Sequence, residues 1–94
     1  MKLEILDFTA KWCGPCRVLK PVLESVAHER SIPITEIDVD DDPMRAQAMR
    51  VTAMPTVVIL RDGREVSRFV GARNRHFVAD LVDRVISEKR ERVA

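Results

Sequence analysis

Residues 12–16 read Trp-Cys-Gly-Pro-Cys, and they follow an apolar stretch at about 2–8 that favours a buried strand. An apolar repeat of helical period begins within this segment and runs over about 14–29. The two cysteines therefore stand where a strand passes into the N-terminus of a helix. Unpaired backbone N–H groups and the positive end of the helix dipole at such a position favour a thiolate. The pattern predicts that Cys13 is a nucleophile.

Cys16 follows Cys13 by three residues, so one helical turn brings the two side chains together, close enough for a disulfide. Pro15 suits the first turn of a helix, where its missing N–H does no harm. The expected chemistry is attack by Cys13 on a client disulfide, after which Cys16 displaces the reduced client.

A metal site is the main competing interpretation of the cysteine pair. Two cysteines at this spacing are also half of a structural zinc site, which normally needs four protein ligands. Only His28 and His76 are available to complete it, and they do not form a second close pair. The sequence therefore favours dithiol chemistry and predicts no metal and no other cofactor.

Outward from the cysteines, strands and helices alternate along the chain. The expected strands lie at about 2–8, 34–39, 56–60 and 65–70, and the expected helices at about 14–29, 43–49 and 74–90. Asp62-Gly63 marks a hairpin between the last two strands, and a right-handed crossover makes the first two strands parallel. The order β-α-β-α-β-β-α predicts an α/β fold with a four-stranded mixed sheet flanked by helices.

Length and charge restrict the class of protein. The chain has 94 residues, enough for one domain over 1–94. Sixteen basic and fifteen acidic side chains leave a formal charge of +1, which argues against a nucleic-acid or membrane-surface partner. No apolar run approaches the ~20 residues of a membrane span, and Glu4 and Asp7 interrupt any signal-peptide core. We therefore expect a cytoplasmic monomer, in a compartment where a close cysteine pair indicates redox chemistry.

The segment at 12–16 resembles the active-site motif of the thioredoxin family in full. Further features fall at the family's spacing: Asp7 at its buried acid, Pro21 at its helix-kinking proline, Met54-Pro55-Thr56 at its cis-proline loop, Asp62-Gly63 at its hairpin turn and Val70-Gly71-Ala72 at its client-facing turn. The similarity runs from residue 3 to about 86. It implies a thioredoxin-like fold and a protein-disulfide reductase.

The resemblance also implies roles for single residues. Cys13 and Cys16 would form the redox pair, Asp7 would relay the proton of Cys16, and Pro55 would follow a cis bond against the disulfide. The active-site turn would comprise Trp12, Gly14 and Pro15, and an apolar rim that docks client backbone would comprise Trp12, Ala53, Met54, Val70, Gly71 and Ala72. Without the resemblance, Asp7 could be a strand-end cap, Pro55 the start of an edge strand, and the rim ordinary surface or partial core.

The sequence departs from the family's pattern in three places. The family's usual first strand and helix are absent, which leaves the strand at 34–39 on the sheet edge, where its acids resist aggregation. Thr9 stands where a second Trp is common, which thins the apolar surface beside the site. Glu36 stands where a Lys is usual, and a carboxylate there should raise the pKa of Asp7.

Three cations, Lys11, Arg17 and Lys20, flank the cysteines. They are expected either to support the Cys13 thiolate or to act as surface charges for solubility.

The leading hypothesis is a small thioredoxin that reduces protein disulfides and is recharged by thioredoxin reductase. Ribonucleotide reductase and peroxiredoxins are client proteins expected from the family alone. One alternative is a glutathione-linked, glutaredoxin-like protein, suggested by the short length, although residues 53–56 lack that family's usual Thr-Val-Pro. The other is a non-enzymatic thioredoxin-fold module that only binds partners.

Overall fold

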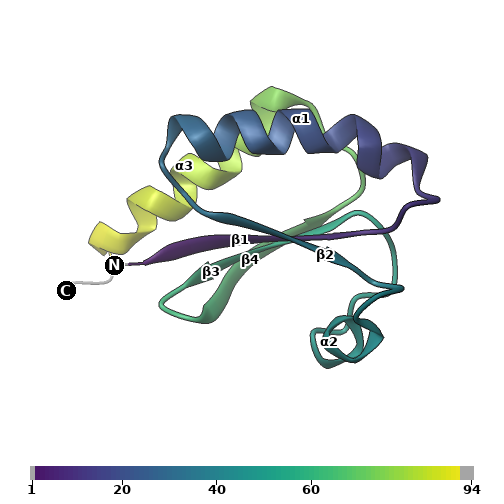
Figure 1. The fold of residues 1–94 in the computed structure, drawn as a ribbon. Helices are drawn as coiled ribbons and strands as arrows, with labels where there is room; N and C mark the ends of the chain where they lie inside the picture. Colours follow the sequence, from purple (N-terminus) through teal and green to yellow (C-terminus); the bar gives the residue numbers. More distant parts are fainter. Residues whose placement is uncertain (1, 92–94) are drawn as a thin grey trace.

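The computed structural model describes residues 2–91 and confirms the predicted order of elements (Figure 1). The elements are β1 (Leu3–Thr9), α1 (Gly14–Glu29), β2 (Ile34–Asp38), α2 (Pro43–Ala48), β3 (Thr56–Arg61), β4 (Arg64–Val70) and α3 (Arg75–Glu91). α1 begins and ends at the residues predicted for it, and the other boundaries lie within one residue of their predictions. None of the helices in residues 2–91 has the length and apolar character needed to cross a bilayer.

The four strands form one mixed sheet in the order β2-β1-β3-β4. β1 pairs with β2 in parallel, and the β1–β3 and β3–β4 pairs are antiparallel. β2 is an edge strand, as predicted, and its register places Glu36 directly beside Asp7 of β1. α1 and α3 cover one face of the sheet and α2 lies on the other (Figure 1).

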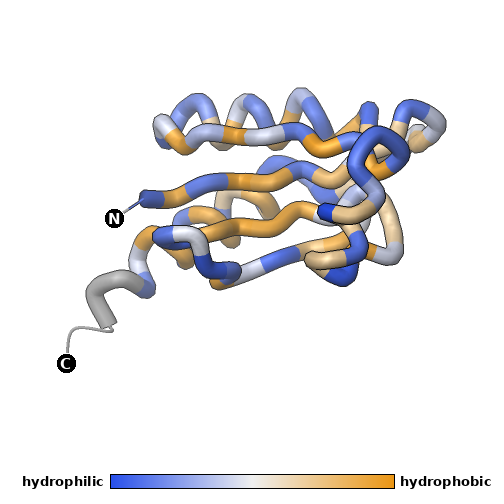
Figure 2. The backbone as a smooth tube through the Cα atoms, turned by 60° about the horizontal axis from the view of Figure 1, so that its bottom comes forward, coloured by the Kyte–Doolittle hydropathy of each residue, from blue (hydrophilic) through white to orange (hydrophobic). Residues whose placement is uncertain are grey.

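The core lies on both faces of the sheet because successive side chains of a strand point to opposite sides. On the α1 and α3 face, Ile5 packs with Leu23 and Val78, all fully buried. On the α2 face, Leu6 and Phe8 pack with Ile37, Val58 and Ala46. Figure 2 shows hydrophilic and hydrophobic positions alternating along the helix that lies over the sheet, as expected for a helix with one face toward a core.

The alternation along β1 determines where its acid lies. Asp7 shares the face of Ile5, so its carboxyl points under α1 and not toward solvent. β1 ends at Thr9, and a bond from the Cys13 N–H to the Ala10 carbonyl, 3.1 Å, turns the chain into α1. The fold thus places the cysteine motif at the N-terminus of α1 and the buried acid on the strand beneath the same helix.

Candidate active site

Cys13 and Cys16 are joined as a disulfide at the N-terminus of α1, with their Cα atoms 5.3 Å apart. Cys13 is the N-cap residue, in extended conformation, and its Sγ accepts the backbone N–H of Cys16 at 3.2 Å. Pro15 occupies the first turn, as predicted. Both cysteines are 4% exposed. The pairing expected from the three-residue spacing is therefore present, with a backbone donor aimed at the Cys13 sulfur.

Of the residues expected to form the apolar rim, Met54 packs beside this disulfide, and a backbone contact ties its loop to the turn after β4. Met54 is half-buried and packs against the cluster of Ala10, Cys13 and Cys16, and its peptide bond to Pro55 is cis. The N–H of Gly71 donates to the Pro55 carbonyl at 2.9 Å, which ties the turn after β4 to the proline loop. Trp12 and Val70 are 65% and 45% exposed, and Ala53 and Ala72 are exposed as well. The site therefore presents apolar surface beside a covered disulfide.

Asp7 is buried, and its Oδ1 has no hydrogen-bond partner within residues 2–91. Burial, followed by the Glu36 carboxylate beside it, raises the pKa of Asp7 to about 6. Lys20 lowers this pKa, and Glu24 on the same helix raises it. The expected direction of the shift is confirmed, but loss of water contributes more than the Glu36 charge.

Lys20 was expected to flank the cysteines, but its ion pair with Glu36 was not predicted from the sequence. Its Nζ lies 3.3 Å from Glu36 Oε2, so the cation of α1 pairs with the carboxylate that adjoins Asp7. This contact raises the pKa of Lys20. The available signal was its spacing: Lys20 follows Cys16 by four residues and so lies on the same helix face.

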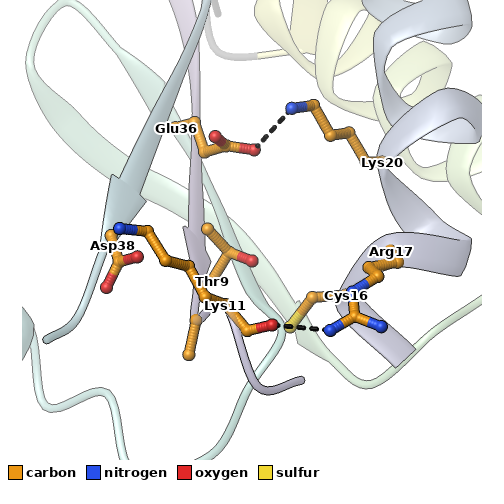
Figure 3. Close-up of a pocket in the computed structure, with 8 residues that line it drawn as sticks. Thr9, Lys11, Cys16, Arg17, Lys20, Glu36 and Asp38 are labelled. Carbon is orange, nitrogen blue, oxygen red and sulfur yellow. Dashed lines mark hydrogen bonds and ion pairs between the residues drawn. The ribbon is translucent and has the colours of Figure 1, made fainter. Parts of the chain in front are cut away.

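A polar cavity of about 190 Å³ opens between α1, the end of β1 and β2 (Figure 3). It is lined by Thr9, Ala10, Lys11, Cys16, Arg17, Lys20, Glu36 and Asp38. Figure 3 shows the Cys16 side chain pointing from α1 toward Thr9 and Lys11. The three cations that were expected to flank the cysteines thus line this cavity together with Cys16.

The model of the thioredoxin family matches residues 1–84. The chain belongs to the thioredoxin family. It is 39% identical over 83 residues to thioredoxin from Chlamydia pneumoniae, covering 87% of this chain and 81% of the relative. The structure of Fasciola hepatica thioredoxin matches with a TM-score of 0.80 and 42% identity, over 88% of this chain and 80% of that one. A mutant thioredoxin from Halobacterium salinarum matches with a TM-score of 0.83 and 36% identity, over 87% and 73%.

Family membership and the Cys13–Cys16 disulfide make the chain an oxidoreductase of the protein-disulfide reductase class, with a redox-active disulfide. Among the residues described, no group of three or more His, Cys, Asp or Glu side chains is arranged to hold a metal ion.

A second contact of this thioredoxin site was missed from the sequence. The Trp12 indole Nε1–H donates to Asp40 Oδ2 at 2.9 Å, and the Asp40 N–H donates to Asp38 Oδ1 at 2.8 Å. The acidic run after β2 therefore holds the exposed tryptophan at the edge of the disulfide. The signal was that β1 and β2 are parallel, so the segments that follow them meet at one end of the sheet.

Proposed function

We propose that this thioredoxin-family chain reduces the disulfides of client proteins through a dithiol–disulfide cycle of Cys13 and Cys16, and that a thioredoxin reductase recharges it. The observation that carries the proposal is the Cys13–Cys16 disulfide at the N-terminus of α1, with the Cys16 N–H directed at the Cys13 sulfur. A backbone donor and the helix dipole both stabilise negative charge on that sulfur.

In the reduced chain, the Cys13 thiolate attacks a client disulfide and forms a mixed disulfide, while the other client sulfur leaves as a thiolate. The Cys16 thiolate then attacks the Cys13 sulfur, the second client sulfur leaves, and the intramolecular disulfide re-forms. Two electrons pass to the client. Asp7 takes the proton of Cys16 in the second step, since its pKa of about 6 lets it exchange protons near neutral pH.

In this proposal, the apolar rim beside the disulfide binds the client proteins. We assign docking of client backbone to Trp12, Ala53, Met54, Val70, Gly71 and Ala72, and the shape of the active-site turn to Trp12, Gly14 and Pro15. Pro55, buried next to Met54, orients the docking loop against the disulfide. The exposed apolar surfaces of Trp12 and Val70 support this assignment, because such surface commonly marks an interaction site.

The proposed cycle operates in the cytoplasm, in a monomer, and draws its electrons from thioredoxin reductase. Its clients are disulfide-containing proteins, with ribonucleotide reductase and peroxiredoxins as the first to test. The match of the thioredoxin family model supports this recharging route over glutathione, the glutaredoxin-like alternative.

A coupled assay tests the proposal. Reduction of insulin disulfides is followed with NADPH and thioredoxin reductase, and separately with glutathione and glutathione reductase. Turnover is expected with the first system, complete loss in Cys13→Ser, and accumulation of a client mixed disulfide in Cys16→Ser. Turnover with glutathione alone would favour the glutaredoxin-like alternative. Client capture that survives the double Cys→Ser substitution, without turnover in the original chain, would favour a binding module.

A further inference from the structure

β2 is at the edge of the sheet and hydrogen-bonds to a single neighbouring strand, β1. The bonds at the two ends of this parallel ladder show which backbone groups of β2 take part. The Ile5 N–H donates to the Pro33 carbonyl at 3.0 Å, and at the other end the Val39 N–H donates to the Thr9 carbonyl at 2.9 Å. Because alternate residues of a strand bond to the same neighbour, every second residue of β2, beginning with Thr35, bonds to β1.

The residues between these direct their backbone groups away from β1, and they are Ile34, Glu36 and Asp38. The Asp38 carbonyl accepts the N–H groups of Asp41 and Asp42, at 3.1 and 2.9 Å, in the turn that follows. The other outward groups are the N–H and C=O of Ile34, the N–H and C=O of Glu36, and the N–H of Asp38. The structure gives them no hydrogen-bond partner within residues 2–91. Such a row of unpaired groups can bind an added strand.

Open space lies on both faces of this edge for the side chains of an added strand. On the α2 face, a groove of about 400 Å³ is lined by Thr35 and Ile37 of β2 and by the turn that follows. On the α1 face, Glu36 and Asp38 line the cavity at Cys16. Since successive side chains of a strand point to opposite faces, an added strand would place its side chains alternately in these two spaces.

The charge of the edge restricts which strand can be added. The groove on the α2 face is lined by four carboxylates and two cations. Lys20, which pairs with Glu36 from the α1 face (Figure 3), does not reverse this excess of negative charge. A second copy of the chain would bring Glu36 and Asp38 against the same acids, and like charges on adjacent strands are destabilising. A basic segment matches the edge in charge.

We propose that the outer edge of β2 binds an extended, basic segment of a partner protein, which adds a strand to the sheet. The acids that keep the edge from pairing with apolar strands or with a second copy favour this partner. Asp38, at the end of β2, lines the cavity at Cys16, so a segment bound on this edge extends toward the active site. The proposal concerns binding and does not depend on the redox cycle of Cys13 and Cys16.

The test uses the 94-residue chain, isotope-labelled for NMR, and three peptides. The first has the extended, basic sequence Lys-Val-Lys-Val-Lys-Val, and the second has Glu in place of each Lys. The third keeps the basic sequence but carries a methyl group on every backbone nitrogen, so it has the same charge and no N–H to donate. NMR titration measures the affinity of the chain for each peptide, and hydrogen exchange measures the protection of each backbone amide.

The basic peptide should bind at least about tenfold more tightly than the acidic one, and more weakly as the salt concentration rises. It should slow the exchange of the outward amides of Ile34, Glu36 and Asp38. The amides of Thr35 and Ile37 already donate to β1 and should change much less. The N-methylated peptide should give none of this protection, because it cannot complete a ladder with β2.

Glu36→Pro removes one outward N–H and no bond to β1, as an edge strand allows. Glu36→Gln makes the same change in charge and keeps the N–H, so it is the matched control. Glu36→Pro should bind the basic peptide about fivefold more weakly than Glu36→Gln does, because one hydrogen bond is lost. If Glu36→Pro does not fold, the peptide series and the exchange measurements on the original chain decide alone.

Equal affinities for the basic and acidic peptides would overturn the proposal, as would unchanged exchange of the Glu36 amide when the basic peptide is bound. Equally tight binding of the N-methylated peptide would also overturn it, because charge alone would then attract the peptide. Slower exchange of the outward amides as the concentration of the chain alone is raised would show that a second copy occupies the edge. No outcome involves a cysteine, so the proposed redox cycle is tested separately.

Discussion

Asp7 and Glu36 are directly paired across the parallel strands β1 and β2, so that a buried carboxyl lies beside a half-exposed carboxylate. Lys20 reaches down from α1 to Glu36 at 3.3 Å and places a positive charge near both acids. The pKa of Asp7 results from opposed contributions, since burial, Glu36 and Glu24 raise it and Lys20 lowers it. Substituting either partner should therefore move the titration of Asp7 in a defined direction.

Glu36→Gln should lower the pKa of Asp7 below about 6, because it removes the nearest negative charge and frees Lys20 to interact with Asp7. Lys20→Met should raise the same pKa, because it leaves both carboxylates without their cation. Carbon-detected NMR titration of the Asp7 carboxyl measures both midpoints. Asp80→Asn, an exposed acid on α3, is the control and should leave the midpoint unchanged. Shifts of the same sign in Glu36→Gln and Lys20→Met would contradict this electrostatic account.

Asp7→Asn should stabilise the chain at neutral pH and leave it nearly unchanged in acid. The pKa of Asp7 is higher in the folded chain than its ordinary value of 3.8, so the folded state binds this proton more tightly than the unfolded state. The stability that Asp7 contributes is therefore fully present below pH 3.8 and is lost as the pH rises through about 6. Removing the charge should gain about 3 kcal/mol at pH 7 to 8.

Urea denaturation of Asp7→Asn and the original chain at pH values from 4 to 8 measures this difference. The same variant should slow client reduction and alter its pH profile, because the proposed proton acceptor for Cys16 is lost. A gain in stability that does not vary with pH would contradict the assigned titration. An unchanged reduction rate and pH profile would contradict the proton-relay role of Asp7.

The sequence could predict those features of the molecule that depend on a local residue pattern or on a position that matches the thioredoxin family. Helical periodicity and the CGPC segment located α1 and the redox pair, and the family position of Glu36 led to the direction of the Asp7 pKa shift. The Lys20–Glu36 pair depends on how α1 is rotated over β2, which no local pattern reports. The cavity at Cys16 likewise depends on how three separate segments, namely the end of β1, the start of α1 and β2, meet in space.

Asp40→Ala should weaken client reduction without changing the equilibrium redox potential of the cysteine pair. The Asp40 carboxylate accepts the Trp12 indole N–H at 2.9 Å, and this bond restrains a residue that is 65% exposed. Loss of one such bond is worth about 1 kcal/mol, so a fall in kcat/KM of about fivefold is expected. Insulin reduction and Trp12 fluorescence anisotropy measure the two effects.

Asp41→Ala is the matched control for Asp40→Ala, because Asp41 is the next acid of the same turn and its side chain is exposed. It should change neither the reduction rate nor the mobility of Trp12. A fall in kcat/KM that is equal in the two variants would show that overall charge of the turn, and not the bond to Trp12, affects clients.

Gly71→Ala should both destabilise the chain and slow client reduction, whereas Gly63→Ala should only destabilise it. Both glycines have a positive φ, +92° at Gly71 and +82° at Gly63, and an added Cβ would meet nothing within 4 Å at either position. The cost therefore comes from backbone conformation alone and is about 1 kcal/mol in each case. Gly71 differs because its N–H holds the Pro55 carbonyl beside the disulfide, while Gly63 lies in the β3–β4 hairpin turn.

Thermal unfolding and insulin reduction are measured on both glycine variants at the same temperature. Similar losses of stability with a reduction rate that falls only in Gly71→Ala would show that the Gly71–Pro55 contact positions the client-docking loop. If the strained turn of Gly71→Ala unfolds locally, its rate of insulin reduction should recover in part at lower temperature. If the loop has moved to a new position, that rate should remain low. Equal reduction rates in Gly71→Ala and Gly63→Ala would remove Gly71 from the proposed docking surface, because the shared backbone strain would then account for every effect of the substitution.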